Sequence, residues 1–351
     1  MSLIRINMFS SAEKVKGQGV ASAYRELINM LEKRFSDTFI IRINNYQASD
    51  ISHYHTIDPL FYLSTFLRKT RGVRVGYVHF LPETLQGSIK LLRPLQAIVN
   101  WYVTSFYKRM DKLVVVNPSF IDDLVRFGLN REKITYIPNF VSSQTFYPQE
   151  EKTKQSFRQE LGYQANDFIV LGIGQIQERK GVDDFIQLAI DNPHIQFIWV
   201  GGFSFGMITD GYDKYKKIVN EPPANLKFTG IVDRDQINDY YNLADLFLLP
   251  SFNELFPMSI LESFNCHLPV MLRKLDLYDA VIADKYIEAR DVNEMHAKLN
   301  DYYQHREKLL PYIEKSKQAA QFYSEDHVAQ MWYEYYTGLL ENQEINELPP
   351  L

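Results

Sequence analysis

Residues 245–272, DLFLLPSFNELFPMSILESFNCHLPVML, contain two patterns that together indicate the architecture of the chain. The first seven residues are mostly apolar without alternation, which predicts a strand buried on both faces of a sheet. After a short loop, Pro257 is placed to be the first residue of a helix that runs to Asn265, and PVML (269–272) forms the next strand. This strand, helix and strand indicate a βαβ unit in a parallel sheet covered by helices.

The same alternation of strands and helices continues in both directions. In the second half it predicts strands at 168–175, 195–202 and 226–232, helices at 182–191 and 235–242, and a helical tail at 292–340. In the first half it predicts strands at 3–9, 38–44, 50–56, 73–80, 112–117 and 133–141, with helices at 20–33, at 59–69 and in a long stretch up to 110. A polar stretch, residues 142–167, separates the halves. We expect an α/β protein with two Rossmann-like domains facing each other across a cleft, with a boundary near Tyr147.

The composition is that of a folded chain in a reducing compartment. The 351 residues are 46% hydrophobic and 23% charged, which excludes a disordered protein. The single cysteine, Cys266, builds neither a disulfide framework nor a cysteine-rich zinc site. The start of the chain lacks the pattern of a secretory signal, and no run of 18 apolar residues occurs. We therefore expect a cytoplasmic protein.

The charge is distributed unevenly along the chain. The net charge is −5, yet residues 1–150 carry 19 basic and 12 acidic residues, against 19 and 31 in residues 151–351. Within residues 63–112, nine cations accompany only Glu83 and Asp111. The cations alternate with Leu, Trp101 and other aromatic residues, so this region is suited to an anionic membrane surface. An internal helix with snorkelling cations is the alternative. A pI near 5.9 and the lack of a nucleic-acid motif argue against nucleic acid.

A glycine turn followed by cations indicates a phosphate site. VLGIGQIQERKG (170–181) runs from a strand through Gly172 and Gly174 to Arg179 and Lys180, before a helix. Backbone N–H groups, a helix N-terminus and fixed positive charge would converge there on a phosphate. Gln177 occupies the place of the third glycine, so this is not a dinucleotide fingerprint. From these residues alone, a surface turn with solvated cations is an equally good interpretation.

A second glycine turn, KVKGQGVASAY (14–24), opens the first predicted long helix. Gly17 and Gly19 nearly imitate the nucleotide fingerprint, but about eight residues separate them from the preceding strand, which is too long for that tight turn. We expect a loop whose amides approach a sugar or phosphate. A turn that only begins the helix, without binding a ligand, is an equally good interpretation.

Two glutamates, Glu254 and Glu262, stand eight positions apart across the strand–helix junction. The first helical turn, taken as 256–259, would present free backbone donors to the cleft. Glu262 lies farther along the helix, where it could hold the vicinal hydroxyls of a ribose or pack against the turn at Gly172. The alternative is that both are solvated surface acids.

These residues resemble glycosyltransferase family 4, whose fold is termed GT-B. The segment 250–270 is similar to the family's E-x7-E element, and GIGQIQERKG (172–181) to its phosphate-binding turn. VHF (78–80), YIPNFV (136–141) and LKFTGIV (226–232) resemble its histidine motif, its domain-closing segment and its base-contacting strand. The sequence departs from the family at two positions: Gln175 replaces a frequent arginine and Pro257 a frequent glycine.

The resemblance implies a retaining transfer from a nucleotide-activated hexose, without a metal or other cofactor. It implies domains at 1–147 and 148–322, and a C-terminal segment, 323–351, that returns to the first domain. It assigns the leaving diphosphate to Arg179 and Lys180, the donor sugar to Glu254 and the ribose to Glu262. His79 would bond a sugar or acceptor hydroxyl, unless it is a core histidine. The remaining donor-site residues implied are Gly17, Gly19, Gly174, Gln175, Ile231, Phe256, Pro257, Met258 and Ser259.

Within the family, the start INMFSSAEKVKGQGVASAY (6–24) is similar to Gram-positive glycolipid synthases that add a second hexose to glucosyl-diacylglycerol. This implies UDP-glucose or UDP-galactose as donor, a glycolipid acceptor, and a position on the inner face of the cell membrane. Another lipid or soluble saccharide acceptor is the nearest alternative. A nicotinamide-dependent oxidoreductase, which two Rossmann halves alone would permit, and a non-catalytic binding module are the others.

Overall fold

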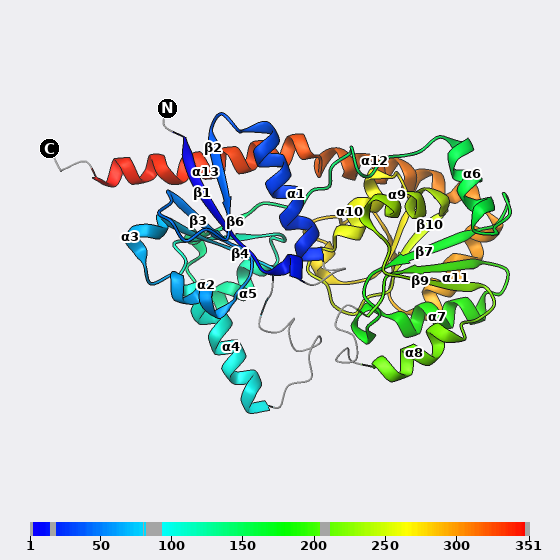
Figure 1. The fold of residues 1–351 in the computed structure, drawn as a ribbon. Coiled ribbons are helices and arrows are strands. Elements are labelled where there is room, and N and C mark those ends of the chain that lie inside the picture. Colours follow the sequence, from blue (N-terminus) through cyan, green and yellow to red (C-terminus); the bar gives the residue numbers. More distant parts are fainter. Residues whose placement is uncertain (1–2, 15–18, 80, 82–92, 204–210, 348–351) are drawn as a thin grey trace.

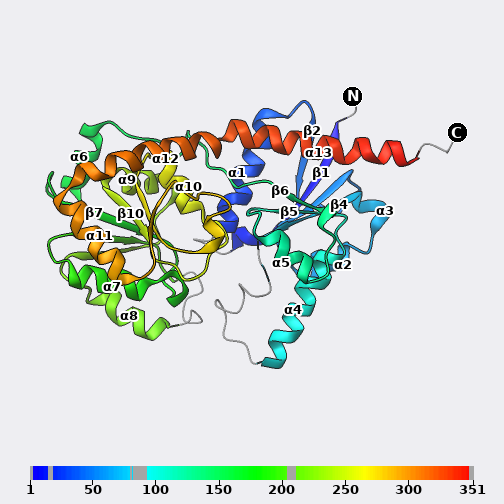
Figure 2. The same ribbon diagram turned by 180° about the vertical axis from the view of Figure 1, so that it is seen from behind.

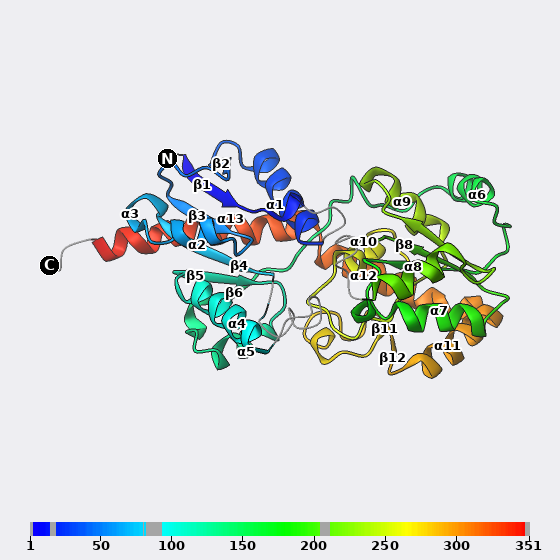
Figure 3. The same ribbon diagram turned by 60° about the horizontal axis from the view of Figure 1, so that its bottom comes forward.

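In a computed structural model, the structure describes residues 3–14, 19–79, 81, 93–203 and 211–347. Within these residues the chain forms two parallel sheets of six strands each, with orders β2-β1-β3-β4-β5-β6 and β12-β11-β10-β7-β8-β9. Each sheet belongs to its own domain, and helices surround both (Figure 3). The predicted α/β architecture is therefore confirmed.

The strands of both sheets are short and largely buried, because helices cover the two faces of a parallel sheet. The strands of the first sheet are β1 (Ile4–Phe9), β2 (Phe39–Ile43), β3 (Ile51–Tyr54), β4 (Val73–Val78), β5 (Lys112–Val115) and β6 (Ile134–Tyr136). Those of the second are β7 (Ile169–Ile173), β8 (Gln196–Val200), β9 (Leu226–Gly230), β10 (Leu246–Leu249), β11 (Val270–Arg273) and β12 (Ile287–Ala289).

Helices follow most strands. In the first domain they are α1 (Gly19–Arg34), α2 (Pro59–Ser64), α3 (Arg68–Arg71), α4 (Arg93–Lys108) and α5 (Phe120–Arg126). In the second they are α6 (Glu151–Glu160), α7 (Val182–Asp191), α8 (Tyr212–Asn220), α9 (Arg234–Leu243), α10 (Met258–Asn265), α11 (Val292–Gln304) and α12 (Leu310–Phe322). The predicted helix at 59–69 is wrong in its extent, because the chain turns between α2 and α3. Helix α4 projects from the body of the first domain (Figure 1).

The last helix, α13 (Glu325–Glu347), leaves the second domain and lies along the first (Figure 2). Its Tyr336 hydroxyl is 2.7 Å from the His53 Nδ1 of β3, and its Trp332 packs edge-on against Tyr77 of β4. The expected return of the C-terminal segment is thus confirmed. The exact boundaries at 147 and 322 remain predictions.

The carboxyl ends of both sheets' strands meet at the contact between the domains. The side chain of Asn117, just beyond β5, donates to the carbonyl of Leu277, beyond β11, at 2.8 Å. Helix α1 contacts α10 of the second domain at the same junction (Figures 1 and 3). The loops that the sequence marks for binding therefore lie between the two domains.

Candidate active site

The site in the second domain lies where its strand order reverses. β7 and β10 are neighbours, but the chain continues from β7 to β8 on one side and from β10 to β11 on the other. Ligands of open α/β sheets bind in the crevice beyond the carboxyl ends of two such strands. The glycine turn follows β7 and the loop carrying Glu254 follows β10, so the fold brings two separate motifs together.

The glycine turn is held tightly against the end of β10. Gly181 has φ +70°, and a Cβ there would collide with the carbonyl oxygen of Pro250. Only glycine fits this close approach without strain. The backbone N–H of Phe252 also donates to the carbonyl of Arg179 at 2.9 Å. The turn therefore presents Arg179 and Lys180 directly to the loop after β10.

Lys180 and Glu254 form a buried ion pair. The Lys180 Nζ is 2.5 Å from Glu254 Oε1, and the two residues are only 9% and 6% exposed. Arg179 supports the pair: its guanidinium is 3.7 Å from Glu254 Oε2 and donates to the Asn253 carbonyl at 2.8 Å. Burial opposes ionisation of Glu254, but the charges of Lys180 and Arg179 outweigh it and keep the pKa of Glu254 below its usual value.

Glu262, on α10, is also buried and is 5% exposed. Its Oε2 accepts a hydrogen bond from the Tyr241 hydroxyl at 2.6 Å, and its Oε1 accepts one from Arg234 at 3.2 Å. Gly172 packs instead beneath Trp199 and Phe185. Neither predicted glutamate is a solvated surface acid.

The start of α10 differs by one position from the prediction. Pro257 has an extended ψ of 138° and is the N-cap, so Met258 is the first helical residue. Its carbonyl accepts a hydrogen bond from the N–H of Ile260 at 3.1 Å, as the carbonyl of an N-cap residue does. The first-turn donors are therefore those of Met258 and Ser259, whereas Phe256 precedes the helix and packs its ring on Tyr323.

Gly19, the first residue of α1, faces this helix start. A Cβ at Gly19 would lie 3.9 Å from Met258 Cγ, so the two helix N-termini approach each other across the domain contact. Gly17 lies outside the described residues. The helix that follows the glycine turn of the first domain is thus directed toward the second.

Three other predicted positions surround the second-domain site. A Cβ at Gly174 would lie 3.6 Å from the methylene groups of Lys180, and the Gly174 carbonyl accepts a hydrogen bond from the Trp199 indole at 3.0 Å. Gln175, in place of the usual arginine, accepts a hydrogen bond from the Gln177 side chain at 2.5 Å. Ile231 follows Gly230 at the end of β9 and is half-exposed.

His79 follows β4 and is the outermost member of a buried histidine row. Its Nε2 is 3.4 Å from the Nδ1 of His55, whose ring lies 4.2 Å from that of His53. Burial lowers the pKa of His79 to about 3, so the ring is neutral. The structure thus gives His79 core-like packing at the end of a strand, and its predicted bond to a sugar stays a prediction.

Sequence reasoning missed three residues beside the glutamates. Arg234 and Tyr241 hold Glu262, as described above. Burial and the nearby charge of Glu254 together raise the pKa of Tyr278. Among the described residues, its buried hydroxyl has no hydrogen-bond partner. No local pattern marks any of the three, because each acts through contacts with distant parts of the chain.

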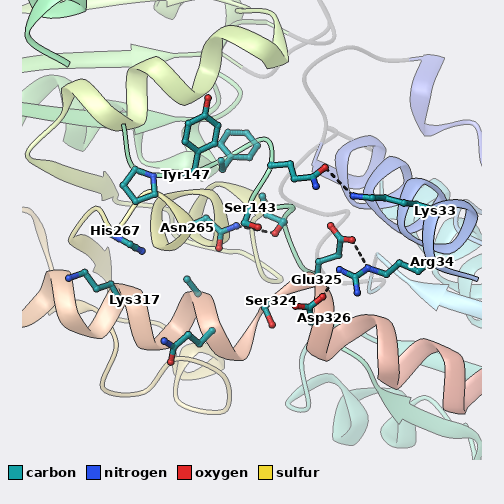
Figure 4. A pocket seen from close by; sticks show the side chains of 16 residues that line it. Lys33, Arg34, Ser143, Tyr147, Asn265, His267, Lys317, Ser324, Glu325 and Asp326 are labelled. Carbon is teal, nitrogen blue, oxygen red and sulfur yellow. Dashed lines mark hydrogen bonds and ion pairs between the residues drawn. The ribbon is translucent and has the colours of Figure 1, made fainter. Parts of the chain in front are cut away.

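A cavity of about 400 Å³ lies elsewhere, between α1, α10, the α12–α13 junction and the linker, by which we mean residues 137–150 between β6 and α6 (Figure 4). None of the predicted site residues lines it. In the described part of the chain, no group of three or more His, Cys, Asp or Glu side chains is arranged to hold a metal ion. Across the same described ranges, no helix is both long and apolar enough to cross a membrane.

Comparisons with known proteins agree with this architecture. The family "Glycosyltransferase Family 4" matches residues 15–145 and "Glycosyl transferases group 1" matches residues 153–319. The alpha-galactosylglucosyldiacylglycerol synthase of Streptococcus pneumoniae is 51% identical over 95% of this chain and 89% of its own. The processive diacylglycerol alpha-glucosyltransferase of Acholeplasma laidlawii is 31% identical over 38% of this chain and 39% of its own.

Solved structures share the fold. HepE of Anabaena, crystallised with UDP and glucose, has a TM-score of 0.77 at 16% identity, covering 95% of this chain and all of its own. The lipopolysaccharide glycosyltransferase WaaG has a TM-score of 0.71 at 14% identity, with 95% of this chain covered and all of its own. The expected GT-B fold is confirmed.

Proposed function

This chain belongs to the glycosyltransferases that combine a family 4 domain with a group 1 domain. We propose that it transfers galactose from UDP-galactose to glucosyl-diacylglycerol. The 51% identity to the galactosylglucosyldiacylglycerol synthase supports this acceptor and hexose. Membership of the family displaces the oxidoreductase alternative. The choice of galactose over glucose is part of the proposal.

The observation that carries the proposal is the ion pair between Lys180 and Glu254. The loops after β7 and β10 place these side chains, with Arg179, in one buried cluster beside the N-terminus of α10. As a glycosidic bond to a diphosphate breaks, negative charge grows on the leaving group. Fixed cations and helix N–H groups stabilise that charge electrostatically.

We propose for the site residues the roles that the family resemblance implies, and this placement supports those of Lys180, Arg179 and Glu254. Lys180 and Arg179, together with the N–H groups of Met258 and Ser259, would bind the diphosphate. Glu254 would accept hydroxyls of the donor sugar, and the pairing with Lys180 keeps its carboxylate ionised. Glu262 would hold the ribose, and the backbone of Ile231 would contact the base. Transfer without a metal remains our prediction, since these cations are suited to neutralise the diphosphate.

The lipid acceptor requires that the first domain meets a membrane. Side chains of α2, α4 and the segment between α2 and α3 leave large apolar groups exposed: Leu60, Leu63, Phe66, Leu67, Ile98 and Trp101. Exposed Arg68, Lys69 and Lys108 accompany them. We therefore place the enzyme on the anionic inner face of the cell membrane, as a peripheral protein.

Not all cations of the 63–112 region serve this surface. Arg71 and Arg74 are buried: Arg71 donates to backbone carbonyls of residues 46 and 47, and Arg74 pairs with Asp111. Arg109 lies over the Phe66 ring, 3.4 Å from its centroid. The charge available to a membrane is consequently smaller than the sequence total.

The test is a transfer assay with the full chain. UDP-galactose and UDP-glucose are each offered with glucosyl-diacylglycerol in vesicles containing an anionic lipid, and products are identified by mass spectrometry. We expect dihexosyl-diacylglycerol from UDP-galactose. Transfer only to diacylglycerol or to a soluble sugar would overturn the acceptor, and a preference for UDP-glucose would overturn the donor. Stabilisation against heat by NADH but not by UDP would contradict the reaction class.

A further inference from the structure

Arg234 joins three separate parts of the molecule. Its guanidinium donates to Glu262 Oε1 at 3.2 Å, to Glu26 Oε1 at 2.5 Å and to Ser22 Oγ at 3.2 Å. The same group lies 5.0 Å from the ring centroid of Phe146. Glu262 belongs to α10 of the second domain, Ser22 and Glu26 to α1 of the first, and Phe146 to the linker. One side chain therefore touches both domains and their connection.

The cluster is buried and contains two carboxylates for one guanidinium. Glu26 is 7% exposed and Glu262 5%. Burial raises the pKa of Glu26, and the charge of Arg234 opposes that shift. For Arg234 the two carboxylates outweigh burial, so its pKa is raised and it stays charged. Buried charges of this kind depend strongly on their partners, so each member fixes the position of the others.

The arrangement leaves Glu262 free to accept further hydrogen bonds. An ionised carboxylate offers about four acceptor sites. Arg234 uses one on Oε1 and the Tyr241 hydroxyl uses one on Oε2. Among the hydrogen bonds of the described residues, one site therefore remains on each oxygen, which matches the two hydroxyls of a ribose diol.

We propose that Arg234 and Glu26 are positioning residues for ribose recognition: Glu26 of the first domain holds Arg234, and Arg234 orients Glu262 of the second. This inference rests on the proposed use of a UDP-sugar. Glu26 belongs to the other domain, so the ribose site is complete only when α1 is docked against α9 and α10. By linkage, donor binding and domain docking then favour each other by the same factor.

The test compares nucleotides that differ only in the ribose hydroxyls. UDP and 2′,3′-dideoxy-UDP are titrated calorimetrically into the wild-type chain, Glu26→Gln and Arg234→Lys. Arg34→Gln is the matched control, because Arg34 lies on the same helix and pairs instead with Glu325 and Asp326. Thermal unfolding of each variant verifies that it is folded. Arg234→Lys keeps a positive charge in the cluster and provides the test if Glu26→Gln does not fold.

We expect both variants to bind UDP about tenfold more weakly than the wild type does, which corresponds to the loss of one well-aligned hydrogen bond to a charged group. We expect them to bind the dideoxy analogue as tightly as the wild type does. The donor KM should rise accordingly, while kcat at saturating donor stays within about twofold. Equal weakening of both nucleotides, or of neither, would overturn the positioning role. Failure of the wild type to bind UDP at all would instead sink the proposed function, and the inference with it.

Discussion

The proposed catalysis depends on how Lys180 and Arg179 balance the buried negative charge of Glu254. Glu254 and Lys180 are 74 positions apart, and each motif is recognisable in the sequence by itself. The sequence does not reveal that the two side chains bond each other, because the contact is made by neighbouring strand ends in the folded sheet. A substitution of Lys180 must therefore be interpreted with this pairing in mind, because it also removes the nearest partner of the buried Glu254 carboxylate.

We expect Lys180→Met to lose both stability and activity, for separable reasons. Lys180→Met leaves the buried Glu254 carboxylate with only the Arg179 guanidinium, 3.7 Å away, and should lower the free energy of unfolding by about 3 kcal/mol. Adding Glu254→Gln removes that charge and should restore most of the stability. Turnover should stay at least about 100-fold below wild type in both variants, because the cation that stabilises the leaving diphosphate is gone.

Urea unfolding and hexose transfer from UDP-galactose, measured on both variants and on Glu254→Gln alone, separate these effects. Recovery of wild-type turnover in the double variant would contradict the role of Lys180. If the double variant is no more stable than Lys180→Met alone, the loss of stability does not come from the charge of the Glu254 carboxylate.

The residues that sequence reasoning missed share a physical cause. Arg234 is the first residue of α9 and has the appearance of an exposed helix-start cation. Its partners Glu26 and Glu262 are 208 and 28 positions away, and neither spacing is a local signal. Motifs identify residues that touch the ligand, whereas residues that orient them depend on tertiary packing.

Most strands and the longer helices were predictable from the sequence pattern, whereas several short helices were not. The predicted helix at 182–191 coincides with α7, but the one at 59–69 divides into α2 and α3. Thr65 ends the first piece, since its hydroxyl bonds the Tyr62 carbonyl at 2.6 Å and competes with the helical backbone. The pattern also missed α5, α8 and the three-residue edge strand β12.

The same elements make a specific prediction about membrane binding. Trp101 is 67% exposed on α4, so Trp101→Ala should weaken binding to anionic vesicles about tenfold at both low and high salt. Replacing Lys69 and Lys108 with Ser should weaken binding chiefly at low salt, by about 1 kcal/mol for each cation. Vesicle co-sedimentation over a salt series measures both effects.

Ile190→Ala is the control, because Ile190 is also exposed but lies on α7 of the second domain. Binding by Trp101→Ala that equals wild type would exclude α4 from the membrane surface. Equal sensitivity of the Ile190 variant would indicate unspecific adhesion instead.

At the scale of the whole molecule, the chain passes between the domains twice, through the linker after β6 and through the α12–α13 junction. The first passage was predictable from its polar composition. The packing of α13 on the first sheet was expected only from the family resemblance. The Tyr-rich pattern of this helix does not indicate which distant part of the chain it packs against. Tyr336 meets His53 across 283 positions, and this contact closes the histidine row from its inner end.

That row predicts how global stability depends on pH. Burial, with the neighbouring histidine charges, holds the pKa values of His53 and His55 well below 6.5, and burial lowers that of His79 to about 3. Below pH 6.5 the unfolded chain therefore binds protons that the folded chain excludes, so stability falls as pH falls. Each neutral buried histidine costs about 1.4 kcal/mol per pH unit there, or about 4 kcal/mol for three.

Urea unfolding between pH 7.5 and 5 measures this slope. Well below pH 6.5, His53→Phe should reduce it by about 1.4 kcal/mol per pH unit, because the unfolded chain loses one histidine whose proton the folded chain excludes. The aromatic groups around the row, Tyr77, Trp332 and Tyr336, stay neutral over this range and cannot supply the change. His194→Asn, which removes an exposed imidazole from the second domain, is the control. An unchanged slope in His53→Phe would mean that His53 accepts a proton in the folded protein, and that the row is open to water.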